Sequence, residues 1–107
     1  MLHYHVWFNL RPEVTESSGL AVVQRFLADL CEIDETQSFH ILRNHGESPR
    51  SKLPRYHALV IFRDEEHFST AMKNQAARGI HTGPHGAVVD VVTGFHVEIF
   101  TSIDEVG

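Results

Sequence analysis

Residue types alternate with a period of two in four short segments of this chain. In residues 3–10 the apolar set is Tyr4, Val6, Phe8 and Leu10, and the alternate set is His3, His5, Trp7 and Asn9. The same division recurs in residues 39–42, 56–62 and 95–100. Because successive side chains of a strand point to opposite faces, each segment predicts a strand with one apolar face and one mixed histidine and aromatic face. Five of the nine histidines fall on the mixed face: His3, His5, His40, His57 and His96.

The segments between these strands favour helices. Apolar residues recur at three- and four-residue spacings from Leu20 to Cys31, with Thr15 or Ser17 as the preceding cap. A second apolar stripe, from Phe68 to Ala76, lies between a capping Asp64 and a terminating Gly79. Residues 83–92 are ambiguous, because their β-branched residues favour a strand whereas Pro84 suits the first turn of a helix. We expect a short helix there.

This order of elements predicts one domain, residues 1–107, of the α+β class. It is the ferredoxin-like βαββαβ arrangement, a four-stranded antiparallel sheet with two helices on one face. The other face would carry five large apolar side chains: Trp7, Leu42, Leu59, Ile61 and Phe100. So much apolar surface is unfavourable in water, so we expect a homodimer in which two sheets pack face to face into an α/β barrel.

Charge and composition exclude several kinds of partner. The formal net charge of −5 argues against nucleic acid or an anionic membrane surface as a partner, because both require a basic surface. Cys31 is the only cysteine, which excludes a disulfide framework, and its position on an apolar helix stripe indicates a core residue. No apolar stretch approaches a membrane span and no signal pattern precedes the first strand, so a cytoplasmic location is expected.

Two histidines of the mixed face are candidates for chemistry. His5 and His57 lie on strands that are adjacent and antiparallel in this topology, beside Trp7, and two imidazoles in a semi-dry pocket can act as an acid–base pair. The alternative is that both are core histidines bonded to backbone or water. Further residues of the mixed face would contact the ligand: Trp7, Asn9, Leu59, Ile61, His96, Glu98 and Phe100.

A metal site is the less favoured interpretation of the histidines. His5, His57 and His96 could supply imidazoles, but the chain has no compact motif such as His-Glu-x-x-His. We therefore expect no metal and no cofactor. The basic residues Arg43, Arg50, Lys52 and Arg55 surround one loop, which either clamps a carboxylate or phosphate or is simply solvated.

Three short segments resemble the dimeric α/β-barrel superfamily, in particular its stress-responsive A/B-barrel group. They are residues 5–8 in the first strand, residues 62–64 entering the second helix, and residues 81–85, which look like that group's His-Pro-x-His stretch. The superfamily includes cofactor-free monooxygenases, polyketide cyclases, haem-handling enzymes, isomerases and members with no known activity. The resemblance implies the same fold and a homodimer.

The resemblance to a plant polyketide cyclase of this fold implies a histidine-lined site of His5, His57 and His85. In that enzyme the loop histidine acts as base and pairs with a tyrosine shortly before it. This chain departs from that pattern, because Arg78 or Gly79 occupies the tyrosine position and Pro84 is displaced.

Two functions follow as hypotheses. In the first, His85 or His57 abstracts an acidic proton from an aromatic or polyketide-like carbonyl compound, while His5 and Asn9 bind the enolate oxygen. The second is a non-catalytic dimer that binds a small hydrophobic or aromatic ligand or serves a stress role.

Overall fold

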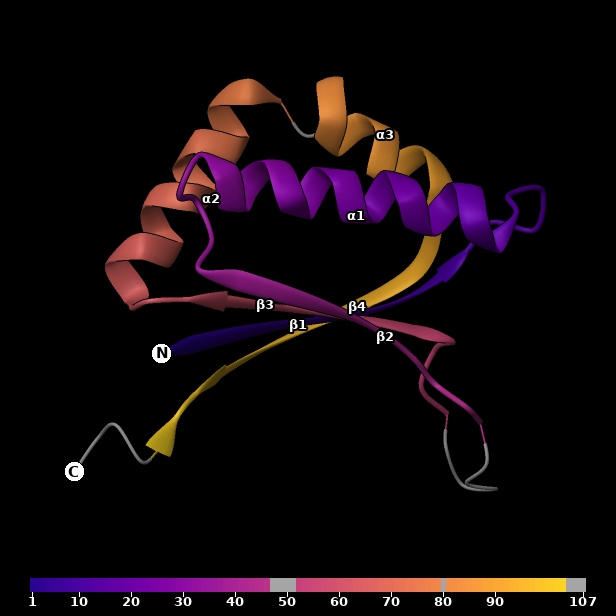
Figure 1. Cartoon of the computed structure of the whole chain (residues 1–107), viewed down its shortest axis with the longest axis horizontal. Coiled ribbons are helices and arrows are strands. Elements are labelled where there is room, and N and C mark those ends of the chain that lie inside the picture. The colour runs from indigo at the N-terminus through magenta and orange to yellow at the C-terminus, as the bar shows by residue number, and fades with distance from the viewer. Residues whose placement is uncertain (47–51, 80, 104–107) are drawn as a thin grey trace.

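The computed structural model describes residues 1–46, 52–79 and 81–103. Its elements follow the order β1 (Leu2–Leu10), α1 (Glu16–Glu32), β2 (Ser38–Arg43), β3 (Tyr56–Phe62), α2 (Glu65–Arg78), α3 (Gly83–Val91) and β4 (Val92–Thr101). The strands form one antiparallel sheet in the order β2-β3-β1-β4. All three helices cover one face of this sheet, and the opposite face is open (Figure 1). The predicted α+β ferredoxin-like fold is therefore confirmed.

Helices α1 and α2 begin where a capping side chain accepts a hydrogen bond from a free backbone N–H group. The Thr15 hydroxyl accepts a hydrogen bond from the Ser18 N–H at the start of α1, and the Asp64 carboxylate accepts one from the His67 N–H at the start of α2. Gly79 ends α2 with φ of 93°, a backbone conformation that glycine adopts without a steric penalty. The ambiguous segment forms α3, with Pro84 in its first turn, where the missing N–H costs no helical hydrogen bond.

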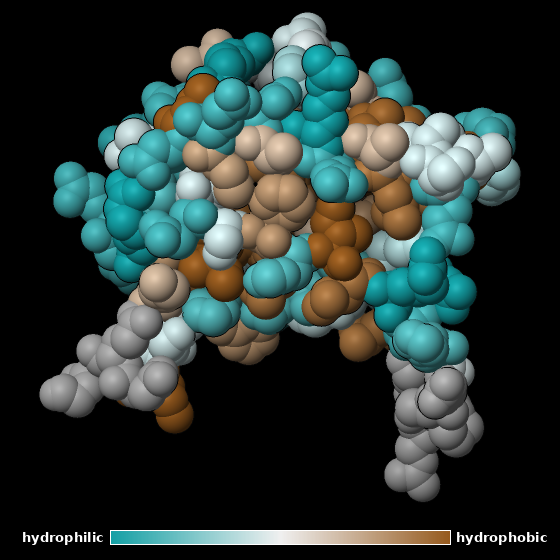
Figure 2. Space-filling model, in the orientation of Figure 1, coloured by the Kyte–Doolittle hydropathy of each residue, from teal (hydrophilic) through white to brown (hydrophobic). Residues whose placement is uncertain are grey.

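The core lies between the helices and the apolar face of the sheet. Phe8, Val60 and Phe62 on the strands and Val23 and Leu27 on α1 are all buried. Apolar residues also gather between the helix layer and the sheet on the side of the molecule shown in Figure 2, framed there by hydrophilic residues. None of the described helices is long and apolar enough to cross a membrane.

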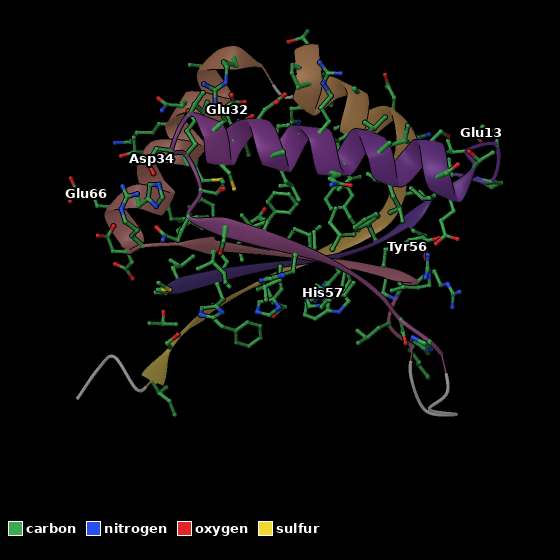
Figure 3. All side chains as sticks on the ribbon, viewed as in Figure 1. Glu13, Glu32, Asp34, Tyr56, His57 and Glu66 are labelled. Atoms are coloured by element: carbon green, nitrogen blue, oxygen red, sulfur yellow. The ribbon has the colours of Figure 1, made fainter. Side chains whose placement is uncertain are left out.

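The strand register arranges the open face as a grid. Its first row is Ser38, Ile61, His3 and Phe100; its second is His40, Leu59, His5 and Glu98; its third is Leu42, His57, Trp7 and His96. The five histidines of the mixed face therefore lie together on the side of the sheet away from the helices. Figure 3 shows one of them, His57, on that side. We call these three rows the histidine face.

Candidate functional site

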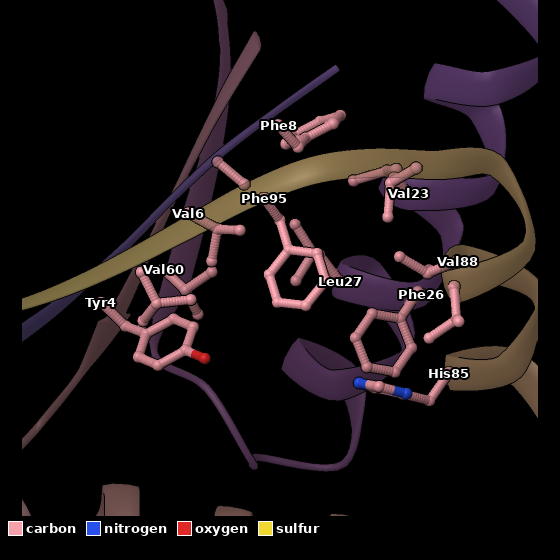
Figure 4. Close-up of a pocket in the computed structure, with 14 residues that line it drawn as sticks. Tyr4, Val6, Phe8, Val23, Phe26, Leu27, Val60, His85, Val88 and Phe95 are labelled. Carbon is pink, nitrogen blue, oxygen red and sulfur yellow. The ribbon is translucent and has the colours of Figure 1, made fainter. Parts of the chain in front are cut away.

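A cavity of about 200 Å³ lies between the sheet and the helices. Strands β1, β3 and β4 form its floor, and α1 and α3 form its roof (Figure 4). Its lining is almost entirely apolar: Tyr4, Val6, Phe8, Val23, Phe26, Leu27, Ala58, Val60, His85, Val88, Val89, Val92, Phe95 and Val97. An apolar cavity with a few polar groups is typical of a small-molecule site, because the apolar walls supply affinity and the polar groups set orientation.

Tyr4 supplies one of these polar groups. It belongs to the apolar face of β1, and its ring contacts the rings of Phe62 and Phe68. Figure 4 shows its hydroxyl pointing into the cavity, toward the side on which His85 lies. Burial raises the pKa of the Tyr4 hydroxyl above its ordinary value, because the phenolate loses more hydration than the phenol. The hydroxyl therefore stays protonated at neutral pH and can donate a hydrogen bond to a ligand oxygen.

His85 supplies the second polar group, from the first turn of α3. Its ring lies edge-on to Phe26 of α1, with the ring centres 5.3 Å apart. The next residue, Gly86, is buried against the preceding turn, where its N–H donates to the Thr82 carbonyl oxygen. A Cβ at position 86 would come within 2.7 Å of the His81 carbonyl group, so only glycine fits without moving the backbone beside His85.

Two further hollows adjoin the cavity. One of about 290 Å³ shares Tyr4, Phe26, Leu27, Val60 and His85 with it. The other, of about 400 Å³, lies between α1, α2 and the start of α3, and includes Asp29, Gln75 and Arg78. Phe26 and His85 line all three spaces. His85 therefore lies between the apolar cavity and the hollow that contains Asp29, Gln75 and Arg78.

The cavity wall is open along β4. Phe95 lines the cavity and is nevertheless 67% exposed, and Ile99 on the same face of that strand is 51% exposed. The Phe95 side chain therefore offers a ligand an apolar surface that is accessible to solvent in a single chain.

On the other side of the sheet, His5 and His57 form a hydrogen-bonded pair. The His5 Nδ1 and His57 Nε2 atoms are 2.9 Å apart, and the ring of Trp7 stacks on both imidazoles. Desolvation by burial lowers the pKa of both histidines, and the pKa of His5 is lowered further by the neighbouring His3. The predicted proximity of His5 and His57 is thus observed, and their role in chemistry stays a prediction.

The structure of a single chain does not bring His85 together with His5 and His57. His85 lies on the helix side of the sheet, whereas the pair lies on the open face. The physical reason is the pleat of the strands. Helix α3 packs over the apolar face, so a residue of α3 meets Tyr4 and Val6 rather than the alternate residue His5.

The other residues expected to bind a ligand also lie outside the cavity. None of the following lines it: Trp7, Asn9, Leu59, Ile61, His96, Glu98 and Phe100. His96 is 3.3 Å from the Glu98 carboxylate, and Phe100 contacts the His5 ring edge-on. The Asn9 side-chain Oδ1 accepts a hydrogen bond from the Arg55 backbone N–H.

Sequence reasoning missed Tyr4, Phe26 and Val88 as cavity residues. The available signal was a tyrosine among the aliphatic residues of an apolar strand face, since a buried hydroxyl needs a partner or a polar ligand. Phe26 and Val88 gave no signal, because apolar residues on helices are ordinarily core.

Neither a metal site nor an anion clamp emerges from the described residues. Within residues 1–46, 52–79 and 81–103, no group of three His, Cys, Asp or Glu side chains is placed to hold a metal ion. In the basic loop, Arg43 pairs with Glu16 of α1, and Arg55 donates to the Asn44 carbonyl oxygen. Arg50 lies outside the described residues.

Solved structures of the same fold resemble this chain over almost its whole length. SnoaB from Streptomyces nogalater, a cofactor-independent oxygenase solved as a mutant, has 17% identity and a TM-score of 0.70, covering 94% of this chain and 91% of that chain. At3g17210 from Arabidopsis thaliana has 10% identity and a TM-score of 0.75, covering 95% of each chain. A dabb family protein from Mesorhizobium loti has 19% identity and a TM-score of 0.56, covering 94% of this chain and 95% of that one.

At these identities the likeness concerns the fold. It confirms the ferredoxin-like fold, and several further matches are described as dimeric ferredoxin-like proteins of unknown function. A search of curated proteins found no significant match. One protein family does match, over residues 1–105, and the chain therefore belongs to the "Family of unknown function (DUF6614)".

Proposed function

We propose that this protein binds a small, largely apolar carbonyl compound in the cavity between its sheet and its helices, and that it is a cofactor-independent enzyme. The observation that carries the proposal is the position of two polar groups, the Tyr4 hydroxyl and the His85 imidazole, in an otherwise apolar lining. A compound of aromatic or polyketide-like character matches the aromatic walls that Phe8, Phe26 and Phe95 provide.

The two polar groups suit proton abstraction next to a carbonyl. The His85 imidazole, when neutral, would take a proton from the acidic carbon, and the electron pair of that C–H bond would move onto the carbonyl oxygen. The Tyr4 hydroxyl would donate a hydrogen bond to the enolate oxygen that develops. Return of the proton from His85 to another carbon completes an isomerisation. In a cyclisation, the enolate carbon forms a C–C bond to a second carbonyl of the same compound, and the alkoxide that results takes the proton back from His85; neither reaction needs a cofactor.

The dimensions set the kind of ligand. Apolar cavities of about 150 Å³ accommodate a benzene ring, so about 200 Å³ suits one ring with a small substituent. A longer compound would extend into the adjoining hollow that shares five residues with the cavity. That SnoaB, a protein of this fold, is a cofactor-independent oxygenase supports chemistry that uses only side chains.

We further propose that two copies associate through the histidine face. This face carries Leu42, Leu59, Ile61 and Phe100 among its histidines, and Leu42 and Phe100 are each about half exposed in a single chain. Three rows of four residues cover about 19 by 20 Å, a footprint of roughly 400 Å² before side-chain relief is added. A specific dimer needs on the order of 500 Å² per partner, which this face and its rim can supply.

The experiment is a comparison of binding and turnover in matched variants. Calorimetric titration with aromatic β-keto compounds would measure binding, and consumption of the same compounds would measure turnover. Tyr4→Phe removes only the hydroxyl, and its control is Tyr56→Phe, a buried tyrosine on the same sheet face that lines none of the three hollows. His85→Gln is matched by His81→Gln, an exposed histidine outside these hollows.

We expect Tyr4→Phe and His85→Gln to lose turnover by roughly 100-fold or more, the usual contribution of an acid–base or oxyanion group, while both controls behave like the parent. Binding without turnover in the parent would instead identify a non-catalytic ligand-binding protein. Binding that neither cavity variant alters would place the ligand elsewhere and refute the proposal.

A further inference from the structure

The histidine face carries an unusual distribution of ionisable groups. All five histidines of the four strands lie on it, and Glu98 is its only carboxylate. With neutral histidines the face has a charge of about −1, and with protonated histidines about +4, because each imidazole gains one positive charge. A twofold axis would place each such face against an identical one, so the same groups would meet from both copies.

The His5–His57 pair is the part of this face least able to accept protons. Its hydrogen bond between Nδ1 and Nε2, 2.9 Å long, needs one nitrogen to donate and the other to accept. The pair can take up one proton on a nitrogen outside this bond and keep the bond, but with both imidazoles protonated two N–H donors would face each other and the bond would break. Trp7 and Phe100 enclose the His5 ring, and a second copy would remove the remaining water from it.

We propose that the His5–His57 pair makes the association of two copies sensitive to protons, so that the dimer forms at neutral pH and dissociates in mild acid. The inference rests on the proposed dimer. The remaining ionisable groups of the face act in the same direction: His3 on β1, His40 on β2 and His96 on β4 would add positive charge to both surfaces. Glu98 opposes this effect, because its carboxylate lies beside His96 and its negative charge offsets part of the added positive charge.

The size of the effect follows from proton linkage. An ordinary imidazole with a pKa of ~6.5 is about nine-tenths protonated at pH 5.5, so excluding one proton per chain weakens a dimer by at most roughly 100-fold between pH 7.5 and 5.5. In the single chain the pKa of both histidines is already lowered, which brings the effect below that limit. We therefore expect the dissociation constant to rise by about 10-fold or more, short of the limit.

The test is sedimentation velocity with fluorescence detection over a dilution series at pH 7.5 and 5.5. Three proteins are compared: the parent, the double variant His5→Gln with His57→Gln, and the control His81→Gln, at an exposed residue before α3. Glutamine keeps hydrogen-bonding capacity and cannot be protonated in this range. Circular dichroism at both pH values reports whether the fold survives, and the single variant His57→Gln replaces the double variant if the latter does not fold.

The expected result is a pH-dependent dimer for the parent and for His81→Gln, and loss of most of that dependence in the variant of the pair. A parent dimer of equal affinity at both pH values would overturn this inference alone, and so would a variant that keeps the full dependence. Dissociation that coincides with loss of the helical signal would likewise overturn it, since acid unfolding would then be the cause. A parent that is monomeric at pH 7.5 would refute the proposed dimer as well.

Discussion

Filling the cavity should stabilise the protein and abolish ligand binding at the same time. Val88 of α3 lines the cavity, and Val88→Phe would add about four carbon atoms to it. At ~0.8 kcal/mol for each buried carbon, complete burial would raise the free energy of unfolding by about 3 kcal/mol. Because the cavity wall is open at the exposed Phe95, we expect about half of that value.

A gain of about 1.5 kcal/mol corresponds to a rise in melting temperature of roughly 6–10 °C for a chain of this size. Differential scanning calorimetry measures it, with Ala87→Phe as the control, because residue 87 is the exposed neighbour of Val88 and lines none of the hollows. The control should change neither stability nor binding appreciably. A fall in melting temperature for Val88→Phe would mean that the space is already occupied by side chains, and would refute the cavity and the binding site together.

Four further outcomes are expected. Tyr4→Phe should change the free energy of unfolding by about 1 kcal/mol or less in urea titrations, because it removes a hydroxyl without opening a void; a larger loss would indicate a structural role. Arg78→Met should cost about 1–2 kcal/mol by the same method, since it leaves the buried carboxylate of Glu35 without its half-exposed cation; no loss would show the pair to be dispensable. The melting temperature should fall as the pH is lowered below ~6.5, because the pKa values of His5 and His57 are lowered in the folded chain. The unfolded chain therefore binds more protons than the folded chain in this pH range. A melting temperature that stays constant from pH 7.5 to 5.5 would contradict this. Elemental analysis after dialysis against EDTA should find well under one metal ion per chain, and stoichiometric metal would overturn the cofactor-free interpretation.

Period-two alternation was sufficient to predict the sheet, because a strand that covers a core on one side must alternate. It placed β3 at residues 56–62 and assigned every residue of the histidine face except Ser38 to its side. The caps Asp64 and Gly79 were also predictable, since each satisfies a local hydrogen-bonding or backbone requirement, and Thr15 is one of the two caps expected for the first helix.

The cavity was not predictable in the same way. The mixed face was expected to line a binding site, yet the helices pack on the apolar face and leave a gap there. Such a gap depends on how closely α1 and α3 approach the sheet, which is set by tertiary packing at Phe26, Val88 and Gly86 rather than by periodicity. The position of His85 could nevertheless have been anticipated in part, because any residue of a covering helix must meet the apolar face of the strands.

Strand β1 lies in the interior of the sheet between β3 and β4, and its neighbouring side chains serve two separate surfaces. Even-numbered residues such as Tyr4 and Val6 contact the cavity, whereas odd-numbered ones such as His5 and Trp7 lie on the histidine face. Selection for a new ligand can therefore change every second residue of β1 and leave the histidine face intact. An insertion or deletion of one residue within β1 would exchange the two sets, so descendants of this chain should vary by substitution there and not by length.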